Sequence, residues 1–221
     1  FVGAGPGDPD LITLKGRRLL ENTDICIYAG SLVSKEHLDF LKDSCEVYDS
    51  ASMNLDEVLE VMKRGYSEGL DIVRLHTGDP TIYGAIREQM DGLLDMGIED
   101  FEVVPGVSSF TGACSAIKRE FTLPSVSQTV ILTRNAGRTP VPEGEDLEEL
   151  ARHKASMAIF LSVQNISDVV AKLIRGYGSE DVPVAVVYKA TWADQEILYG
   201  TLGDIVDKVK AANINKMSQI L

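Results

Sequence analysis

Short apolar runs alternate with helix-like patterns along this chain, and that alternation limits the fold more than any other feature of the sequence. The strands predicted in the first half are Phe1–Val2, Ile25–Tyr28, Glu46–Tyr48, Ile72–His76 and Phe101–Val104, and the helices lie near 14–22, 35–42, 55–67 and 83–96. Strictly alternating strands and helices indicate a mostly parallel sheet covered on both faces. The first half is therefore predicted to be an α/β domain.

Local signals mark where several of these helices begin and end. Thr13 is predicted to cap the first helix, and Asn54 with Glu57 forms a capping box before the helix near 55–67. Gly69 and Gly97 follow the helices that they are predicted to end, because glycine readily adopts the left-handed conformation after a helix.

The second half begins a new set of elements after a Pro-containing linker at Thr122–Ser125. A further helix, near 108–118, precedes this linker. After the linker, helices are predicted near 145–153, 166–175 and 203–212, and strands at Thr129–Thr133, Met157–Leu161, Val184–Tyr188, Ile197–Thr201 and Ser218–Leu221. Ile197–Thr201 follows its predecessor after a short loop, which favours a hairpin and a mixed sheet. We therefore predict two α/β domains, residues 1–120 and residues 121–221, with a ligand cleft between them.

Composition excludes several classes of function. The net charge of −13 argues against a nucleic-acid surface, which needs clustered Lys and Arg. No run approaches the roughly 20 apolar residues of a membrane span. The three cysteines are widely spaced, which favours reduced thiols in the cytoplasm, and the scattered histidines predict no metal site. The chain begins and stops within predicted strands, so we expect its natural termini to lie outside it.

The first turn, Gly3-Ala-Gly5-Pro6-Gly7-Asp8, nearly matches a dinucleotide-binding fingerprint and then departs from it. Asp8 stands where the third glycine is required, and a carboxylate there repels a pyrophosphate. Pro6 also removes one N–H donor from the turn. The P-loop pattern is absent from the sequence as well. The segment predicts a strand, a tight turn and a helix without a nucleotide-phosphate cradle.

Four further segments follow predicted strands, at the sheet edge where α/β proteins bind ligands. They are His76–Gly84, Val104–Ser109, Thr133–Pro142 and Tyr188–Trp192. Each has a structural and a functional interpretation. Asp79 and Pro80 either begin a helix, as its N-cap and N1 residues, or border a ligand. Ser108 lies at the start of a helix whose free N–H groups either have no ligand or bind a carboxylate. Arg134 and Arg138 are solvated charges or select an anion, and Trp192 packs in the core or lines a site.

Three of these motifs together resemble one family. Gly3–Asp8, Gly78–Pro80 and Pro105–Ser108 are similar to segments shared by the tetrapyrrole (corrin/porphyrin) methyltransferases that use S-adenosylmethionine, and the resemblance runs from Phe1 to Leu221. Gln128–Arg134, Gly137–Pro142 and Val187–Trp192 resemble a narrower branch. That branch methylates precorrin-4, or its cobalt complex, at ring carbon 11 in cobalamin synthesis.

The resemblance implies a two-domain fold with S-adenosylmethionine in a trough between the domains, and direct in-line transfer of its methyl group to a ring carbon. It also implies a homodimer, and it requires no metal held by the protein. The positions that match cofactor contacts are Pro6, Thr77, Gly78, Asp79, Ile82, Ser108, Ser109, Leu161 and Ala190. His76, Arg134 and Arg138 suit the substrate's carboxylates. No general base is assigned, and Asp8 and Lys189 are candidates for proton handling or substrate positioning.

Other functions remain open at the level of sequence. The same fold can methylate uroporphyrinogen-III, another precorrin, a diphthamide precursor or ribosomal RNA, and the acidic charge weakens the last of these. A non-catalytic tetrapyrrole carrier is an alternative outside the enzymes. The residues do not decide whether the substrate carries cobalt, and they do not locate a dimer interface.

Overall fold

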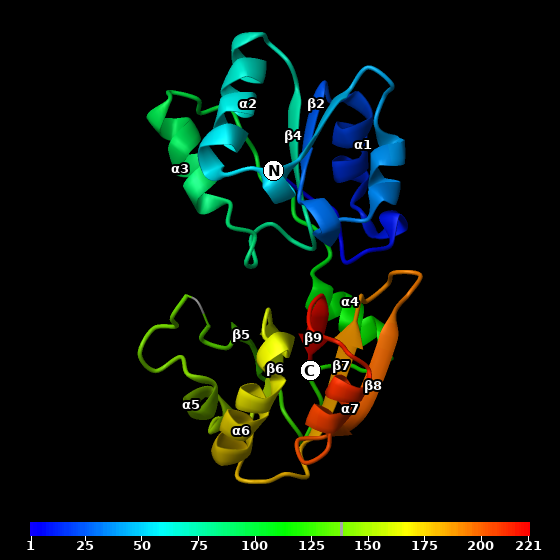
Figure 1. Ribbon diagram of the computed structural model, residues 1–221, viewed down its shortest axis with the longest axis vertical. Coiled ribbons are helices and arrows are strands. Elements are labelled where there is room, and N and C mark those ends of the chain that lie inside the picture. The colour runs from blue at the N-terminus through cyan, green and yellow to red at the C-terminus, as the bar shows by residue number, and fades with distance from the viewer. Residues whose placement is uncertain (138) are drawn as a thin grey trace. The chain divides into compact units, whose positions relative to one another are not determined.

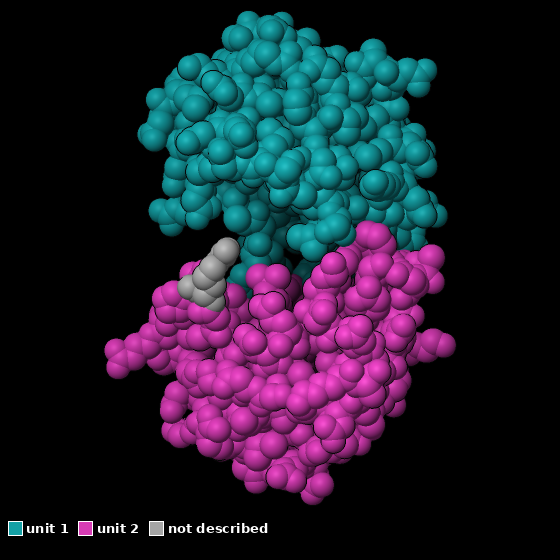
Figure 2. All heavy atoms as spheres, in the orientation of Figure 1, with its two compact units in different colours: residues 1–109 teal, residues 110–221 magenta. Residues whose placement is uncertain are grey.

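A computed structural model describes residues 1–137 and 139–221 of the chain. The chain separates into two compact units, residues 1–109 and residues 110–221, which are coloured separately in Figure 2. The boundary falls at the start of helix α4 (Ser109–Ala116). The predicted boundary, between residues 120 and 121, falls after that helix.

Unit 1 contains a four-stranded sheet in the order β1-β4-β2-β3. Its strands are β1 (Val2–Gly3), β2 (Ile25–Tyr28), β3 (Glu46–Asp49) and β4 (Ile72–His76). Every pairing among them is parallel, as the alternation of strands and helices predicts. β1 and β4 are neighbours in the sheet. The chain that leaves β1 continues to β2 on one side of them, whereas the chain that leaves β4 continues to Val104 on the other side. Ligands of α/β proteins bind at the carboxyl ends of strands whose connections diverge in this way.

One predicted strand of unit 1 is wrong. Phe101–Val104 forms no strand, and only Val104 makes an isolated parallel bridge, with Val2. Val104 donates its N–H to the Phe1 carbonyl at 2.8 Å and accepts from Gly3 N at 3.1 Å. The ladder stops there because β1 has two residues and because Pro105 has no N–H to donate.

The helices of unit 1 cover both faces of its sheet (Figure 1). Leu20 of α1 (Leu14–Asn22) packs in a core with Cys26 and Leu75. On the other face, α2 (Leu55–Ser67) and α3 (Arg87–Asp95) pack against Ile25 and Ile27. The predicted helix starts at Thr13 and Asn54 are confirmed, since Thr13 Oγ1 accepts from Gly16 N and Asn54 forms a capping box with Glu57.

Two predicted helices of unit 1 differ from the structure. Residues Lys35–Phe40 form a 3₁₀ helix, which is tighter than the α-helix expected near 35–42. α3 begins at Arg87, later than the predicted residue 83, because Tyr83 and Ala85 have φ values of 55° and 49°. Positive φ is incompatible with a right-handed helix. Gly69 and Gly97, with φ values of 72° and 76°, follow their helices as predicted.

Unit 2 contains a five-stranded mixed sheet in the order β5-β6-β9-β7-β8. Its strands are β5 (Val130–Arg134), β6 (Ser156–Phe160), β7 (Pro183–Tyr188), β8 (Glu196–Thr201) and β9 (Ser218–Ile220). β5 and β6 are parallel, whereas β9 is antiparallel to both β6 and β7. β7 and β8 form the predicted antiparallel hairpin.

Helices also cover both faces of the unit 2 sheet. Residues of α5 (Leu147–Ala151), α6 (Ile166–Tyr177) and α7 (Ile205–Ala211) share one core with Ile159 and Val186. Ala113 of α4 packs against Val187, which points to the opposite face. Among the described residues, no helix has the length and apolar character needed to cross a membrane.

Candidate functional site

Three glycine-containing turns of unit 1 meet at the carboxyl end of its sheet. Gly5 donates its N–H to the Gly78 carbonyl at 3.2 Å, and Gly78 donates its own N–H to the Gly5 carbonyl at 2.8 Å. Gly106 lies so close that a Cβ added to it would stand 2.1 Å from the Gly78 carbonyl oxygen. The turns therefore pack backbone against backbone, and only glycine at position 106 permits this approach.

Asp79 joins two of these turns through its carboxylate. Oδ1 accepts from Thr81 N at 2.8 Å and from Thr81 Oγ1 at 2.6 Å, while Oδ2 accepts from Gly106 N at 3.1 Å. Of the two interpretations of Asp79, the cap of a helix does not hold, because no helix begins directly after it. Residues 79–82 form a single turn, in which Ile82 N donates to the Asp79 carbonyl. The positive φ of Tyr83 ends this turn.

The other predicted cofactor residues of unit 1 lie on the same turns. Pro6 follows Gly5, and Thr77 and Ile82 flank the Gly78–Asp79 turn. A Cβ added to Gly78 would lie 3.5 Å from Ser109 N and 3.7 Å from the Ser108 Cα, so these two serines adjoin Gly78. Ser109 opens α4, whose first N–H groups favour an anionic group. The cluster offers backbone donors and one carboxylate to a polar ligand.

In unit 2, predicted site residues follow three strands that run in the same direction. Arg134 ends β5, Leu161 follows β6 and Ala190 follows β7. β6 and β7 are parallel to each other because both are antiparallel to β9. The three residues therefore lie at the same edge of this sheet.

Three residues at this edge of unit 2 have strained backbone. Leu161 has a φ of 53°, Lys189 of 45° and Thr191 of 72°. Such values are costly for residues with a Cβ, and a β-branched residue such as Thr191 rarely adopts them. Leu161 is also 67% exposed, so burial does not offset its backbone strain. Strain of this kind clusters at functional sites.

Arg134 organises the loop that follows β5. Its guanidinium donates to the carbonyl oxygens of Asn135 at 3.2 Å, Thr139 at 2.9 Å and Pro140 at 2.8 Å. These acceptors are neutral, and within residues 1–137 and 139–221 no carboxylate forms an ion pair with Arg134. The second predicted cation, Arg138, lies outside the described residues.

His76 is buried in unit 1, with 4% of its surface exposed. Burial first, and the nearby charge of Arg74 second, lower the pKa of the imidazole to about 3. Its Nε2 has no hydrogen-bond partner among the residues that the structure describes. The ring is therefore neutral at pH 7. The contact of His76 with substrate carboxylates stays a prediction. A neutral imidazole has no positive charge with which to attract them.

The two candidates for proton handling have structural partners. Asp8 caps the short 3₁₀ turn Pro9–Leu11 and accepts from Asp10 N at 2.9 Å. Lys189 Nζ lies 2.5 Å from Asp194 Oδ2, and this hydrogen bond raises the pKa of the lysine. Lys189 is therefore an ammonium group at neutral pH, able to attract or donate but not to accept a proton.

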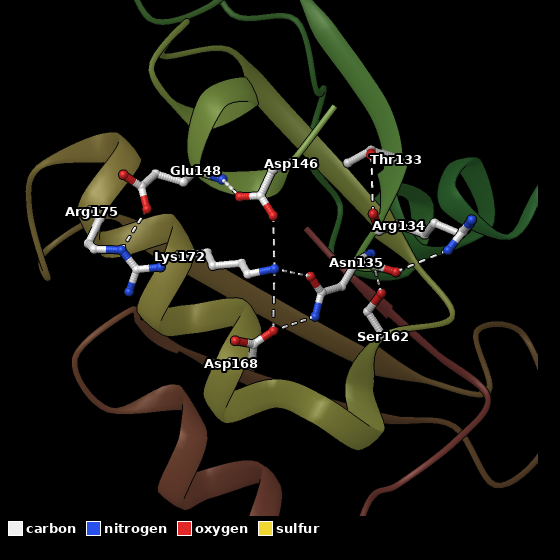
Figure 3. Close-up of polar contacts among 9 residues, drawn as sticks. All are labelled: Thr133, Arg134, Asn135, Asp146, Glu148, Ser162, Asp168, Lys172 and Arg175. Carbon is white, nitrogen blue, oxygen red and sulfur yellow. Dashed lines mark hydrogen bonds and ion pairs between the residues drawn. The ribbon is translucent and has the colours of Figure 1, made fainter. Parts of the chain in front are cut away.

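Two polar residues at the unit 2 edge, Asn135 and Ser162, are not among the predicted site residues. Both are buried, and both lie just beyond a strand end that carries a predicted site residue (Figure 3). Their position after the strands was visible in the sequence, but the partners of Asn135 on α6 and the contact between Asn135 and Ser162 were not. Within residues 1–137 and 139–221, no group of His, Cys, Asp or Glu side chains is arranged to hold a metal ion.

Comparison with known proteins identifies a family whose sequence pattern matches most of this chain. The sequence profile of the Tetrapyrrole (Corrin/Porphyrin) Methylases matches residues 1–206. A cobalt-precorrin-4 C(11)-methyltransferase of Methanocaldococcus jannaschii is 54% identical, over all of this chain and 85% of that protein. A precorrin-4 C(11)-methyltransferase of Pseudomonas aeruginosa is 49% identical, over all of this chain and 87% of that protein.

A solved structure shares the fold. The X-ray structure of a cobalt precorrin-4 methyltransferase, described as a cobalamin biosynthetic enzyme, superimposes with a TM-score of 0.96 at 48% identity. The match covers 99% of this chain and 91% of that one. The predicted α/β class, with one parallel and one mixed sheet, is thereby confirmed.

Proposed function

This chain belongs to the tetrapyrrole (corrin/porphyrin) methylase family, and we propose that it transfers a methyl group from S-adenosylmethionine to ring carbon 11 of precorrin-4 or of its cobalt complex. One observation carries this assignment: relatives named for that reaction are 49–54% identical over the whole chain. The match includes the segments Gln128–Arg134 and Val187–Trp192, which already resembled this branch.

The unit 1 turns fit the polar groups of the methyl donor. S-Adenosylmethionine carries a carboxylate, an ammonium group and ribose hydroxyls, and its sulfonium supplies an already activated methyl group. The start of α4 suits the carboxylate. A carboxylate side chain has about four acceptor positions, and Asp79 uses three of them within the protein. The remaining position suits a hydroxyl or ammonium group.

The protein's task in this reaction is alignment and exclusion of water, because the methyl group needs no further activation. We propose that Pro6, Thr77, Gly78, Asp79, Ile82, Ser108 and Ser109 of unit 1, and Leu161 and Ala190 of unit 2, contact the cofactor. The unit 1 residues are held by the three packed turns. In unit 2, Leu161 has positive φ, and Ala190 lies between two residues with positive φ, Lys189 and Thr191. Rigid turns hold ligands at the cost of little reorganisation.

We propose that Arg134 and Arg138 receive substrate carboxylates. Arg134 is suited to this because its hydrogen bonds go to neutral carbonyls and leave its charge available. His76 is left out of this proposal because it is buried and neutral. Changing Arg138 to Ala should raise the KM for the tetrapyrrole about tenfold and leave cofactor affinity unchanged. Equal losses of both would contradict a role in substrate binding.

The reaction is tested by its regiochemistry. The purified protein is incubated with carbon-13-labelled S-adenosylmethionine and either metal-free or cobalt precorrin-4, and the product is examined by NMR. We expect one labelled methyl group at carbon 11. A label at another ring carbon would retain the family and overturn the branch. Binding of tetrapyrrole without methyl transfer would instead identify a carrier.

The two substrate arms of this experiment also decide the question of cobalt. The relative from Methanocaldococcus jannaschii is named for cobalt-precorrin-4 and the one from Pseudomonas aeruginosa for precorrin-4. A ratio of kcat/KM between the two substrates is therefore the measurement needed.

Assembly, which follows from the resemblance, and location are further proposals. We propose a homodimer, which sedimentation analysis checks by a mass twice that of the chain. We also propose a cytoplasmic location, supported by the three free thiols. Burial raises the pKa of Cys26 to about 12, so that thiol is chemically inert. Cell fractionation tests the location.

A further inference from the structure

Ser162 closes a tight turn around Leu161. The Ser162 hydroxyl donates to the Phe160 carbonyl at 2.6 Å and thereby bridges the residue between them. Leu161, the bridged residue, has the left-handed φ of 53°. A leucine disfavours this conformation, so a bond that closes the turn stabilises it. Ser162 is 2% exposed, and water therefore does not compete for its hydroxyl.

Asn135 fixes the orientation of that hydroxyl. Its backbone N–H donates to Ser162 Oγ at 2.8 Å, so the hydroxyl accepts one hydrogen bond and donates the other. This contact continues the pairing of β5 with β6 one step past Arg134 and Phe160, with a side chain in place of a backbone acceptor. Figure 3 shows Asn135 between Ser162 and the residues of α6.

The Asn135 amide is itself anchored to α6. Nδ2 donates to Asp168 Oδ2 at 2.8 Å, and Oδ1 accepts from Lys172 Nζ at 3.1 Å. Lys172 also pairs with Asp146 at 2.9 Å, and its side chain is largely buried. A continuous set of contacts thus runs from α6 through Asn135 to Ser162 (Figure 3), and Ser162 extends it to the Phe160 carbonyl, which precedes Leu161.

We propose that Ser162 and Asn135 are positioning residues of the cofactor site, which hold Leu161 in its left-handed conformation so that it meets the cofactor. The inference rests on the proposed function, since that function makes Leu161 a cofactor contact. Neither residue need touch the cofactor. Asn135 also accepts from Arg134 through its carbonyl, so the same residue adjoins the loop proposed for substrate.

The first test measures affinity for S-adenosylhomocysteine by calorimetry in Ser162→Ala. Without the hydroxyl, the left-handed state of Leu161 is less populated, and apparent affinity should fall about tenfold. Ser162→Thr retains the hydroxyl and should keep most of the affinity. Asn135→Ala keeps its backbone bond to Ser162 and loses only the anchor to α6, so we expect about a threefold loss. It also serves as the second variant if Ser162→Ala does not fold.

Tyr177→Phe is the matched control. It removes another hydroxyl-to-carbonyl bond of unit 2, from Tyr177 to Ala155, at the opposite edge of the sheet. It should lower the melting temperature and leave affinity unchanged. An equal loss of affinity in Tyr177→Phe and Ser162→Ala would reduce Ser162 to a structural role and overturn the proposal.

The second test is a double-mutant cycle on thermal stability with Leu161→Gly. Glycine adopts positive φ without help, so the drop in melting temperature caused by Ser162→Ala should be about half as large, or less, in the Leu161→Gly chain. An equal drop in both backgrounds would overturn the proposal. Unchanged affinity in Ser162→Ala would do the same. A parent chain that binds no S-adenosylhomocysteine would instead overturn the proposed function.

Discussion

At the scale of the residue, the candidate site contains side chains and backbone conformations that lower the stability of the folded protein. Leu161 combines an exposed apolar side chain with positive φ, and Thr191 is β-branched with positive φ. His76 has a buried nitrogen without a partner among the described residues. Each of these features costs folding free energy, and each lies at or near a strand end that carries predicted site residues.

Replacing Leu161 by Gly should stabilise the protein and weaken cofactor binding. Relief of the left-handed strain is worth roughly 1 kcal/mol, and the exposed side chain loses little burial. Urea unfolding and calorimetry with S-adenosylhomocysteine measure the two effects. Lys118→Gly is the control, because Lys118 is exposed with a φ of 54° and lies in the turn that follows α4. It should gain similar stability with unchanged affinity. A destabilised Leu161→Gly chain would disprove the strain argument.

His76 should make the protein less stable as the pH falls below about 6.5. The folded-state pKa is lowered to about 3, so the unfolded chain binds the proton more readily between these values. Stability is thus fully present above pH 6.5 and declines toward pH 3, by at most about 1.4 kcal/mol per pH unit. His76→Leu removes this contribution. Unfolding free energies of the two chains across pH 4–7 should diverge, and parallel curves would show that His76 titrates normally.

At the scale of the element, the site of unit 1 depends on three turns that pack without side chains between them. Gly3, Gly78 and Gly106 approach one another through backbone atoms, and Asp79 joins the turns from the side. The strands beneath are short, so the turns are fixed as much by their mutual contacts as by the sheet. In unit 2 the corresponding elements are fixed by α6, through Asn135.

Gly106→Ala should therefore separate the unit 1 turns. The new Cβ would stand 2.1 Å from the Gly78 carbonyl, which forces the backbone to move. We expect a stability loss of about 2 kcal/mol or more and a large loss of cofactor affinity. Gly203→Ala is the matched control, since its Cβ would meet only ordinary contacts, at 3.5 Å and beyond. Similar behaviour of the two variants in thermal unfolding would contradict the close packing of the turns.

At the scale of the whole molecule, the cofactor should act as a stabilising ligand of the folded chain. A ligand that binds only the folded state adds about 2.7 kcal/mol at a hundredfold excess over its Kd. For a chain of this size that corresponds to a rise in melting temperature of roughly 5–10 °C. Differential scanning calorimetry with S-adenosylhomocysteine measures it, and adenosine at the same concentration is the control. The absence of any shift would contradict the cofactor assignment.

The sequence by itself determined the local elements and the family of this protein. The bounds of β2 and β4 match their predictions, as do the helix starts at Thr13 and Asn54, because apolar periodicity and capping act over a few residues. The motif turns were located for the same reason, since each is a short run of Gly, Pro and small polar residues. The branch of the family was visible in Gln128–Arg134 and Val187–Trp192.

Tertiary structure alone decided what those residues contact. Asp79 has the local pattern of a helix cap, but its partner Gly106 is distant in the chain and Tyr83 ends the turn. The burial of His76 and the hydrogen bonds of Asn135 to α6 likewise depend on neighbouring residues that the local sequence pattern does not identify. Local sequence specifies backbone conformation over one or two turns, whereas burial, pKa and hydrogen-bond partners are set by segments that only the folded chain brings together.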